Sequence, residues 1–89
     1  MEKILMIGGQ EVDLSKLPQF TIGHKRALFK DHGVDLRRVG QFNPEEEFAF
    51  VLFMLRLVRP ETTEEEVAAL PMGAIARVVN AMLENETRG

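Results

Sequence analysis

The longest apolar stretch of the chain lies near its middle, in residues 43–59, which read NPEEEFAFVLFMLRLVR. Asn43 can cap a helix through its side-chain oxygen, and Pro44 suits the first helical position, where its missing N–H needs no partner. Glutamates follow in the first turn and arginines in the last, as the helix dipole favours, and Pro60 prevents continuation. These signals predict a central helix over about residues 44–59.

This central helix carries apolar residues on two opposite faces. The first face comprises Phe48, Val51, Leu52, Leu55 and Val58. The second face comprises Phe50, Phe53, Met54 and Leu57. A helix that is apolar all round is either enclosed in a core or offers one face to a partner.

Both arrangements fit the sequence. In the first, the N-terminal segment and first helix cover one side of the central helix, and the later helices cover the other. In the second, the second face is a surface for self-association or for an apolar helical client. We take the second as our hypothesis, because Phe and Met are typical of adaptable binding surfaces.

Shorter patterns flank the central helix. Residues 1–14 contain two apolar segments around Gly8-Gly9, a pair that supplies the positive φ angles of a hairpin turn, and they predict a β-hairpin. Thr21 is expected to cap a first helix over residues 22–32 that ends at Gly33. Thr62-Thr63 before three glutamates predicts a third helix to about Leu70, and a last amphipathic helix follows from Pro71.

The predicted fold is therefore mainly α, a small domain of about four helices with an N-terminal β-hairpin. We expect one domain over residues 1–89, with a helical body over residues 21–86 and a frayed tail at residues 87–89. An isolated hairpin is marginally stable, so it must pack against the helices.

Composition narrows the functional classes. The chain has no cysteine, which excludes disulfides, thiolate metal sites and a cysteine nucleophile. It has no run of 18 apolar residues and no signal-peptide pattern, so we expect a soluble intracellular protein without a membrane span. Residues 1–40 carry seven Lys/Arg and five Asp/Glu (+2), and residues 41–89 carry four and nine (−5). Such an acidic chain is an unlikely general binder of nucleic acid.

The titratable clusters have structural explanations. His24 and His32 have no accompanying ligand motif, so we expect helix-capping or solvent-facing histidines and no metal. The runs of glutamate at residues 45–47 and 64–66 sit in first helical turns, where the dipole explains them. No nucleophile, paired base or cofactor motif joins them, and Ser15 is the only serine. We therefore expect no enzymatic activity and no cofactor.

A basic segment surrounds the predicted first helix. It comprises Lys25, Arg26, Lys30, Arg37 and Arg38. A solvated face is the simpler interpretation of such a segment. The alternative is that Lys25, Arg26 and Lys30 contact an acidic partner.

The order of elements resembles that of the small tail assembly chaperones of long-tailed, siphovirus-like bacteriophages. The resemblance rests on the successive segments MIGGQEVDL, FTIGHKRALFKDHGVDL, NPEEEFAFVLFMLRLVRP and TTEEEVAAL, followed by an amphipathic helix. It implies a non-enzymatic protein of the host cytoplasm, absent from the mature virion, that binds the tape measure protein and assists assembly of the tail tube protein. It also implies self-association, and a longer frameshifted product in many cases.

Two other functions stay open at this point. One is a small DNA-associated regulator that uses the basic first helix. The other is a structural head–tail joining protein. The resemblance supplies no motif residues that can be assigned one by one, so the hypothesis for Phe50, Phe53, Met54 and Leu57 rests on the helix pattern alone.

Overall fold

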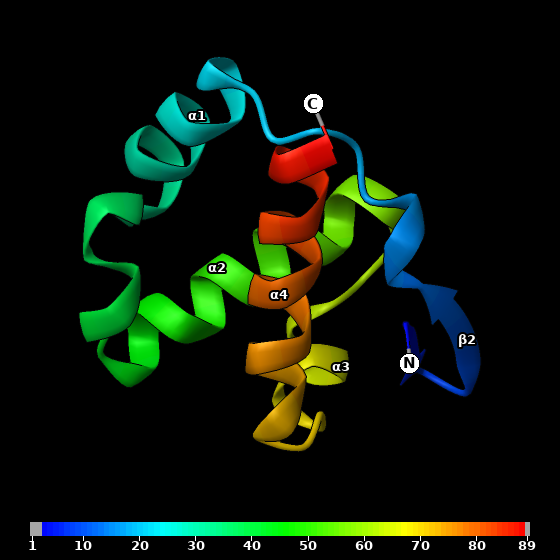
Figure 1. The fold of residues 1–89 in the computed structure, drawn as a ribbon. Coiled ribbons are helices and arrows are strands. Elements are labelled where there is room, and N and C mark those ends of the chain that lie inside the picture. The colour runs from blue at the N-terminus through cyan, green and yellow to red at the C-terminus, as the bar shows by residue number, and fades with distance from the viewer. Residues whose placement is uncertain (1–2, 89) are drawn as a thin grey trace.

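The computed structural model describes residues 3–88 of the chain. A two-stranded hairpin precedes four α-helices, as the sequence predicts (Figure 1). A short 3₁₀ turn, Leu14–Lys16, follows the hairpin, and a second 3₁₀ segment, Leu36–Gln41, joins the first two α-helices.

The hairpin pairs β1 (Ile4–Ile7) with β2 (Gln10–Asp13) in antiparallel register, with Leu5 opposite Val12. The turn is the predicted glycine pair, in which Gly8 has a φ of 56° and Gly9 a φ of 80°. Both values lie in the left-handed region that glycine enters at no steric cost. One face of the hairpin is buried against the helices, since Leu5 and Val12 are almost inaccessible to solvent.

Three helices begin at the predicted caps. Thr21 caps α1 (Ile22–His32), Asn43 caps α2 (Pro44–Val58) and Thr63 caps α3 (Glu64–Ala68), each within a reciprocal capping box. Gly33 ends α1 with a φ of 69°, and its N–H donates to carbonyls of the last turn. These local hydrogen bonds satisfy helix-terminal groups that would otherwise lack partners.

Three boundaries differ from the prediction. Helix α3 ends at Ala68, two residues before Leu70, because Ala69 caps it and the chain turns there. Helix α4 (Gly73–Arg88) begins two residues after Pro71, which instead accepts a hydrogen bond from the Ala74 N–H in the preceding turn. The same helix extends through Arg88, so residues 87 and 88 are helical where we expected fraying. Gly89 lies outside the described residues.

Helix α2 runs through the centre of the molecule, and α4 crosses over it (Figure 1). α1 and the C-terminal end of α4 lie at the top of this view, whereas α3 and the start of α4 lie at the bottom. The core collects residues from both strands and all four α-helices. Its fully inaccessible apolar members include Leu28, Phe50, Met54, Leu55 and Val78.

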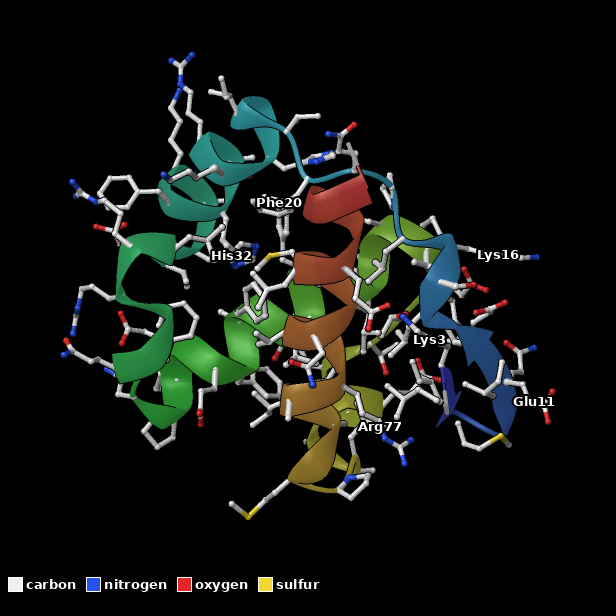
Figure 2. The ribbon with its side chains drawn as sticks, in the orientation of Figure 1. Lys3, Glu11, Lys16, Phe20, His32 and Arg77 are labelled. Carbon is white, nitrogen blue, oxygen red and sulfur yellow. The ribbon has the colours of Figure 1, made fainter. Side chains whose placement is uncertain are left out.

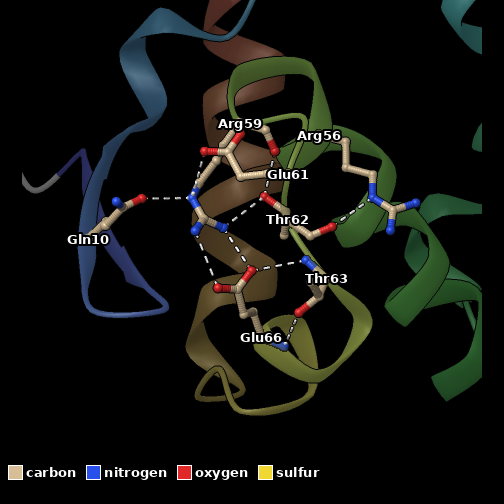
Figure 3. A network of polar contacts seen from close by, with 7 residues as sticks. All are labelled: Gln10, Arg56, Arg59, Glu61, Thr62, Thr63 and Glu66. Carbon is tan, nitrogen blue, oxygen red and sulfur yellow. Dashed lines mark hydrogen bonds and ion pairs between the residues drawn. The ribbon is translucent and has the colours of Figure 1, made fainter.

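A polar network around Arg59 joins the hairpin to the helices (Figure 3). The Arg59 guanidinium, whose side chain is 13% exposed, donates to Gln10 Oε1 at 3.1 Å and to Glu66 Oε1 at 2.8 Å. Glu66 also completes the α3 capping box by accepting from the Thr63 N–H at 3.0 Å. The Arg59 hydrogen bond lowers the pKa of the Glu66 carboxyl. One arginine therefore links β2, the end of α2 and the start of α3.

The first strand is also attached to the last helix. Lys3 forms an ion pair with Glu84, and the Arg77 guanidinium donates to the Ile4 carbonyl at 3.3 Å. Figure 2 shows Lys3 and Arg77 in the space between the hairpin and α4. The paired residues lie more than seventy positions apart in the sequence. The position of the hairpin therefore depends on contacts with α4.

Candidate partner-binding surface

The predicted second face of the central helix is mostly internal. Phe50 and Met54 are fully inaccessible, while Phe53 and Leu57 are partly buried against the same core. The expectation of an accessible apolar face is therefore wrong for Phe50 and Met54. The second face of α2 is thus largely covered by the rest of the chain, which is the first of the two arrangements that the sequence allowed.

Helix α1 and the residue before its cap cover Phe53. The ring centroid of Phe53 lies 6.4 Å from that of Phe20, 6.4 Å from that of His24 and 5.9 Å from that of His32, all edge-to-face. In Figure 2, Phe20 and His32 lie close together between α1 and the C-terminal half of α4. Edge-to-face packing of this kind stabilises by about 0.5–1.5 kcal/mol per aromatic pair beyond the buried area. Phe53 thus fixes α1 on α2.

The two histidines have structural roles. His24 Nδ1 accepts a hydrogen bond from the Thr21 N–H at 3.1 Å, and the His24 N–H donates to Thr21 Oγ1 at 3.1 Å. His24 is therefore the third helical residue of a capping box, a position usually taken by Glu or Gln. Within residues 3–88, no three His, Asp or Glu side chains converge as metal ligands.

The outer face of α1 combines exposed apolar and basic side chains. Ile22 is 88% exposed and Phe29 is 60% exposed, and they lie two helical turns apart. Lys25 and Arg26 lie between them on the same side of the helix. Large side chains at such exposure contribute nothing to the core, and a cluster of them marks an interaction surface.

These side chains border a hollow that we call the α1 groove. One part, of about 330 Å³, lies between α1 and the 3₁₀ segment that follows it. A second part, of about 340 Å³, reaches α4. The two parts share Ile22, Lys25, Leu36 and Arg37. Arg26 and Phe29 line only the first, and Phe20, Met82 and Leu83 only the second.

The α1 groove carries positive charge. Arg37 donates to Asp35 at 2.8 Å, and these hydrogen bonds lower the pKa of Asp35 to about 2. Among the side chains that the structure describes, neither Lys25 nor Arg26 forms an ion pair. The groove is therefore apolar at its base and basic at its rim.

Sequence reasoning identified part of this surface. Lys25 and Arg26, predicted as contacts for an acidic partner, border the groove, whereas the third candidate, Lys30, is exposed on α1 outside its lining. The role of all three in binding stays a prediction. Ile22 and Phe29 were missed, although their seven-residue spacing around Lys25 and Arg26 was visible in the sequence. Met82 and Leu83 come from the distant helix α4, and no local pattern links them to α1.

Comparisons of the chain with protein families, with characterised proteins and with solved structures gave no match. None of the helices in residues 3–88 combines the length and the hydropathy needed to cross a membrane.

Proposed function

We propose that this protein is a non-enzymatic tail assembly chaperone that holds an amphipathic helical segment of the tape measure protein in the α1 groove. The exposure of Ile22 and Phe29 beside the basic side chains of Lys25 and Arg26 is the observation that supports this proposal. An apolar groove that receives the apolar face of a partner helix is a common mode of recognition.

The groove favours a particular kind of client helix. Apolar side chains at helical spacing would fill the base of the groove and contact Ile22 and Phe29. Acidic side chains beside them would meet Lys25 and Arg26. Apolar anchors supply most of the affinity of such contacts, while charge sets orientation and association rate.

The resemblance to tail assembly chaperones supplies the identity of the partners. The tape measure protein is the proposed client, and the tail tube protein is the partner that assembles around it. The proposed place of action is the host cytoplasm, with the chaperone absent from the mature virion. A chaperone needs only reversible binding for this task, which accords with a groove that is open and shallow.

Titration calorimetry with helical fragments of the tape measure protein tests the proposal. We expect saturable binding to the wild type and affinity weakened by about tenfold or more in Phe29→Ala, since truncation of an anchor costs about 1–2 kcal/mol or more. Met6→Ala is the matched control, because Met6 is 55% exposed on the hairpin and lies outside the groove. Equal affinity of Phe29→Ala and wild type, or no binding of any fragment, would contradict the proposal.

A DNA-associated regulator is the second candidate, supported by the same basic side chains of Lys25 and Arg26 on the outer face of α1. Binding to phosphates weakens steeply with salt, whereas binding through Ile22 and Phe29 does not. A gel shift with duplex DNA across a salt series separates the two. A shift that Arg26→Ala abolishes and Phe29→Ala leaves intact would favour the regulator.

A further inference from the structure

A second apolar hollow lies at the other end of the molecule, and we call it the acidic groove. It has a volume of about 320 Å³ and lies where the start of α2, helix α3 and the start of α4 meet. Its apolar lining includes Phe48, Val51, Val67, Leu70, Met72 and Ile75. Met72 is 87% exposed, so one of the largest side chains of the groove is free to repack around an incoming group.

The charge around this groove is negative. Glu47 is the charged residue of its lining. Glu64 is exposed one helical turn before the lining residue Ala68, so it lies on the same stripe of α3. Neither glutamate forms an ion pair with any side chain that the structure describes. An occupant of this groove must therefore bring apolar and basic side chains together.

The outer face of α1 combines the apolar and basic side chains that the acidic groove requires. It presents Ile22 and Phe29 as exposed apolar side chains, with Lys25 and Arg26 between them. We infer that α1 of one copy docks into the acidic groove of a second copy, with Phe29 and Ile22 against the apolar lining and Arg26 facing Glu47. The contact desolvates exposed apolar groups on both partners and pairs Arg26 with Glu47, neither of which forms an ion pair with a side chain that the structure describes.

The positions of the two grooves decide the form of the assembly. Met82 and Leu83 of the α1 groove and Ala74 and Ile75 of the acidic groove come from opposite halves of α4, whose two ends lie at the top and the bottom of the view in Figure 1. A single copy cannot bring its own α1 into its own acidic groove. The contact is therefore head-to-tail and joins different surfaces of successive copies, which closes into a ring or continues as a filament.

Self-docking also regulates access to the client surface. Ile22, Lys25, Arg26 and Phe29 cannot contact a client and a neighbouring copy at once. Client binding then releases the neighbour, and high protein concentration weakens the apparent affinity for the client. This step rests on the proposed function, whereas the self-docking itself does not.

Sedimentation velocity over a concentration series tests the self-docking with two single variants. The wild type should associate, and Arg26→Glu and Glu47→Lys should each raise the dissociation constant by about tenfold or more, because each places like charges together. An equimolar mixture of the two variants should associate again, since the unaltered α1 of one meets the unaltered acidic groove of the other. The double variant should also associate like the wild type. Such association would show that neither substitution prevents the chain from folding.

Each alternative result overturns the inference. A wild type that stays monomeric at all concentrations excludes self-docking. A Glu47→Lys variant that associates like the wild type shows that the acidic groove is not the receiving surface, as in a symmetric pairing of α1 with α1. A mixture or double variant that stays monomeric, with wild-type far-UV circular dichroism, shows that positions 26 and 47 do not meet.

Client titration distinguishes this inference from the proposed function. Glu47→Lys retains the whole α1 groove, so it should bind the tape measure fragment at least as tightly as the wild type, and its affinity should not depend on protein concentration. If self-docking fails its test while this variant binds the fragment, only the inference is wrong. If self-docking holds and no fragment binds, only the proposed function is wrong.

Discussion

Replacing Phe50 with alanine tests the placement of the second face of α2 in the core. The Phe50 side chain is fully inaccessible, and its ring lies 5.7 Å from that of Phe42, centroid to centroid. Removing a buried Phe side chain costs about 3–5 kcal/mol, of which the lost ring pair contributes about 0.5–1.5 kcal/mol. A domain of this length has a typical unfolding free energy of about 4–13 kcal/mol. We therefore expect Phe50→Ala to remove about a quarter or more of the stability.

Urea unfolding followed by far-UV circular dichroism measures this loss. Phe29→Ala is the matched control, because it removes the same atoms from a side chain that is 60% exposed. We expect the control to change the unfolding free energy by no more than about 0.5 kcal/mol, as for most surface substitutions. A cost below about 1 kcal/mol for Phe50→Ala, or equal costs for the two variants, would refute the burial of this face.

Three further predictions concern local hydrogen bonds and turns. His24→Ala should cost about 1–2.5 kcal/mol in urea unfolding, from the lost cap and the lost ring contact with Phe53, and His24→Gln less, because glutamine restores a capping acceptor but not the ring. The lowered pKa of Glu66 means that its stabilisation by Arg59 is fully present above its unfolded pKa of about 4.5 and is lost as the pH falls below it. The stability difference between wild type and Glu66→Gln should therefore shrink below that pH; a constant difference would contradict this. Gly9→Ala should cost about 1–2 kcal/mol for its positive φ, and Gly8→Ala more, because a Cβ there would also collide with the Glu66 carboxylate.

The helix starts could be predicted from the sequence because their causes are local. Thr21, Asn43 and Thr63 each bond to a backbone N–H three residues later, so three or four adjacent residues determine the cap. The hairpin turn at Gly8-Gly9 is determined in the same way. The end of α3 has no comparable signal, since Ala69 follows a helix former and the chain turns for reasons that lie outside the segment.

The candidate site was harder to predict because exposure depends on distant packing. The sequence of α2 alone cannot tell whether Met54 faces a partner or the rest of the chain. Met54 is fully buried, and the neighbouring Phe53 packs against rings that lie up to 33 residues away in sequence, which no pattern within α2 specifies. The same packing turns Ile22 and Phe29 outward. The apolar surface that the sequence led us to seek on α2 therefore occurs on α1 instead.

The attachment of the hairpin has a consequence for the order in which the chain becomes stable. The hairpin is synthesised before the helices, yet a two-stranded hairpin is marginal by itself. Its partners are Arg59 through Gln10, Arg77 through the Ile4 carbonyl, and Glu84 through Lys3. All three partners leave the ribosome long after the hairpin does. The hairpin is thus made before the helices but is stabilised only after them, and shortening α4 should destabilise the hairpin as well as the helix.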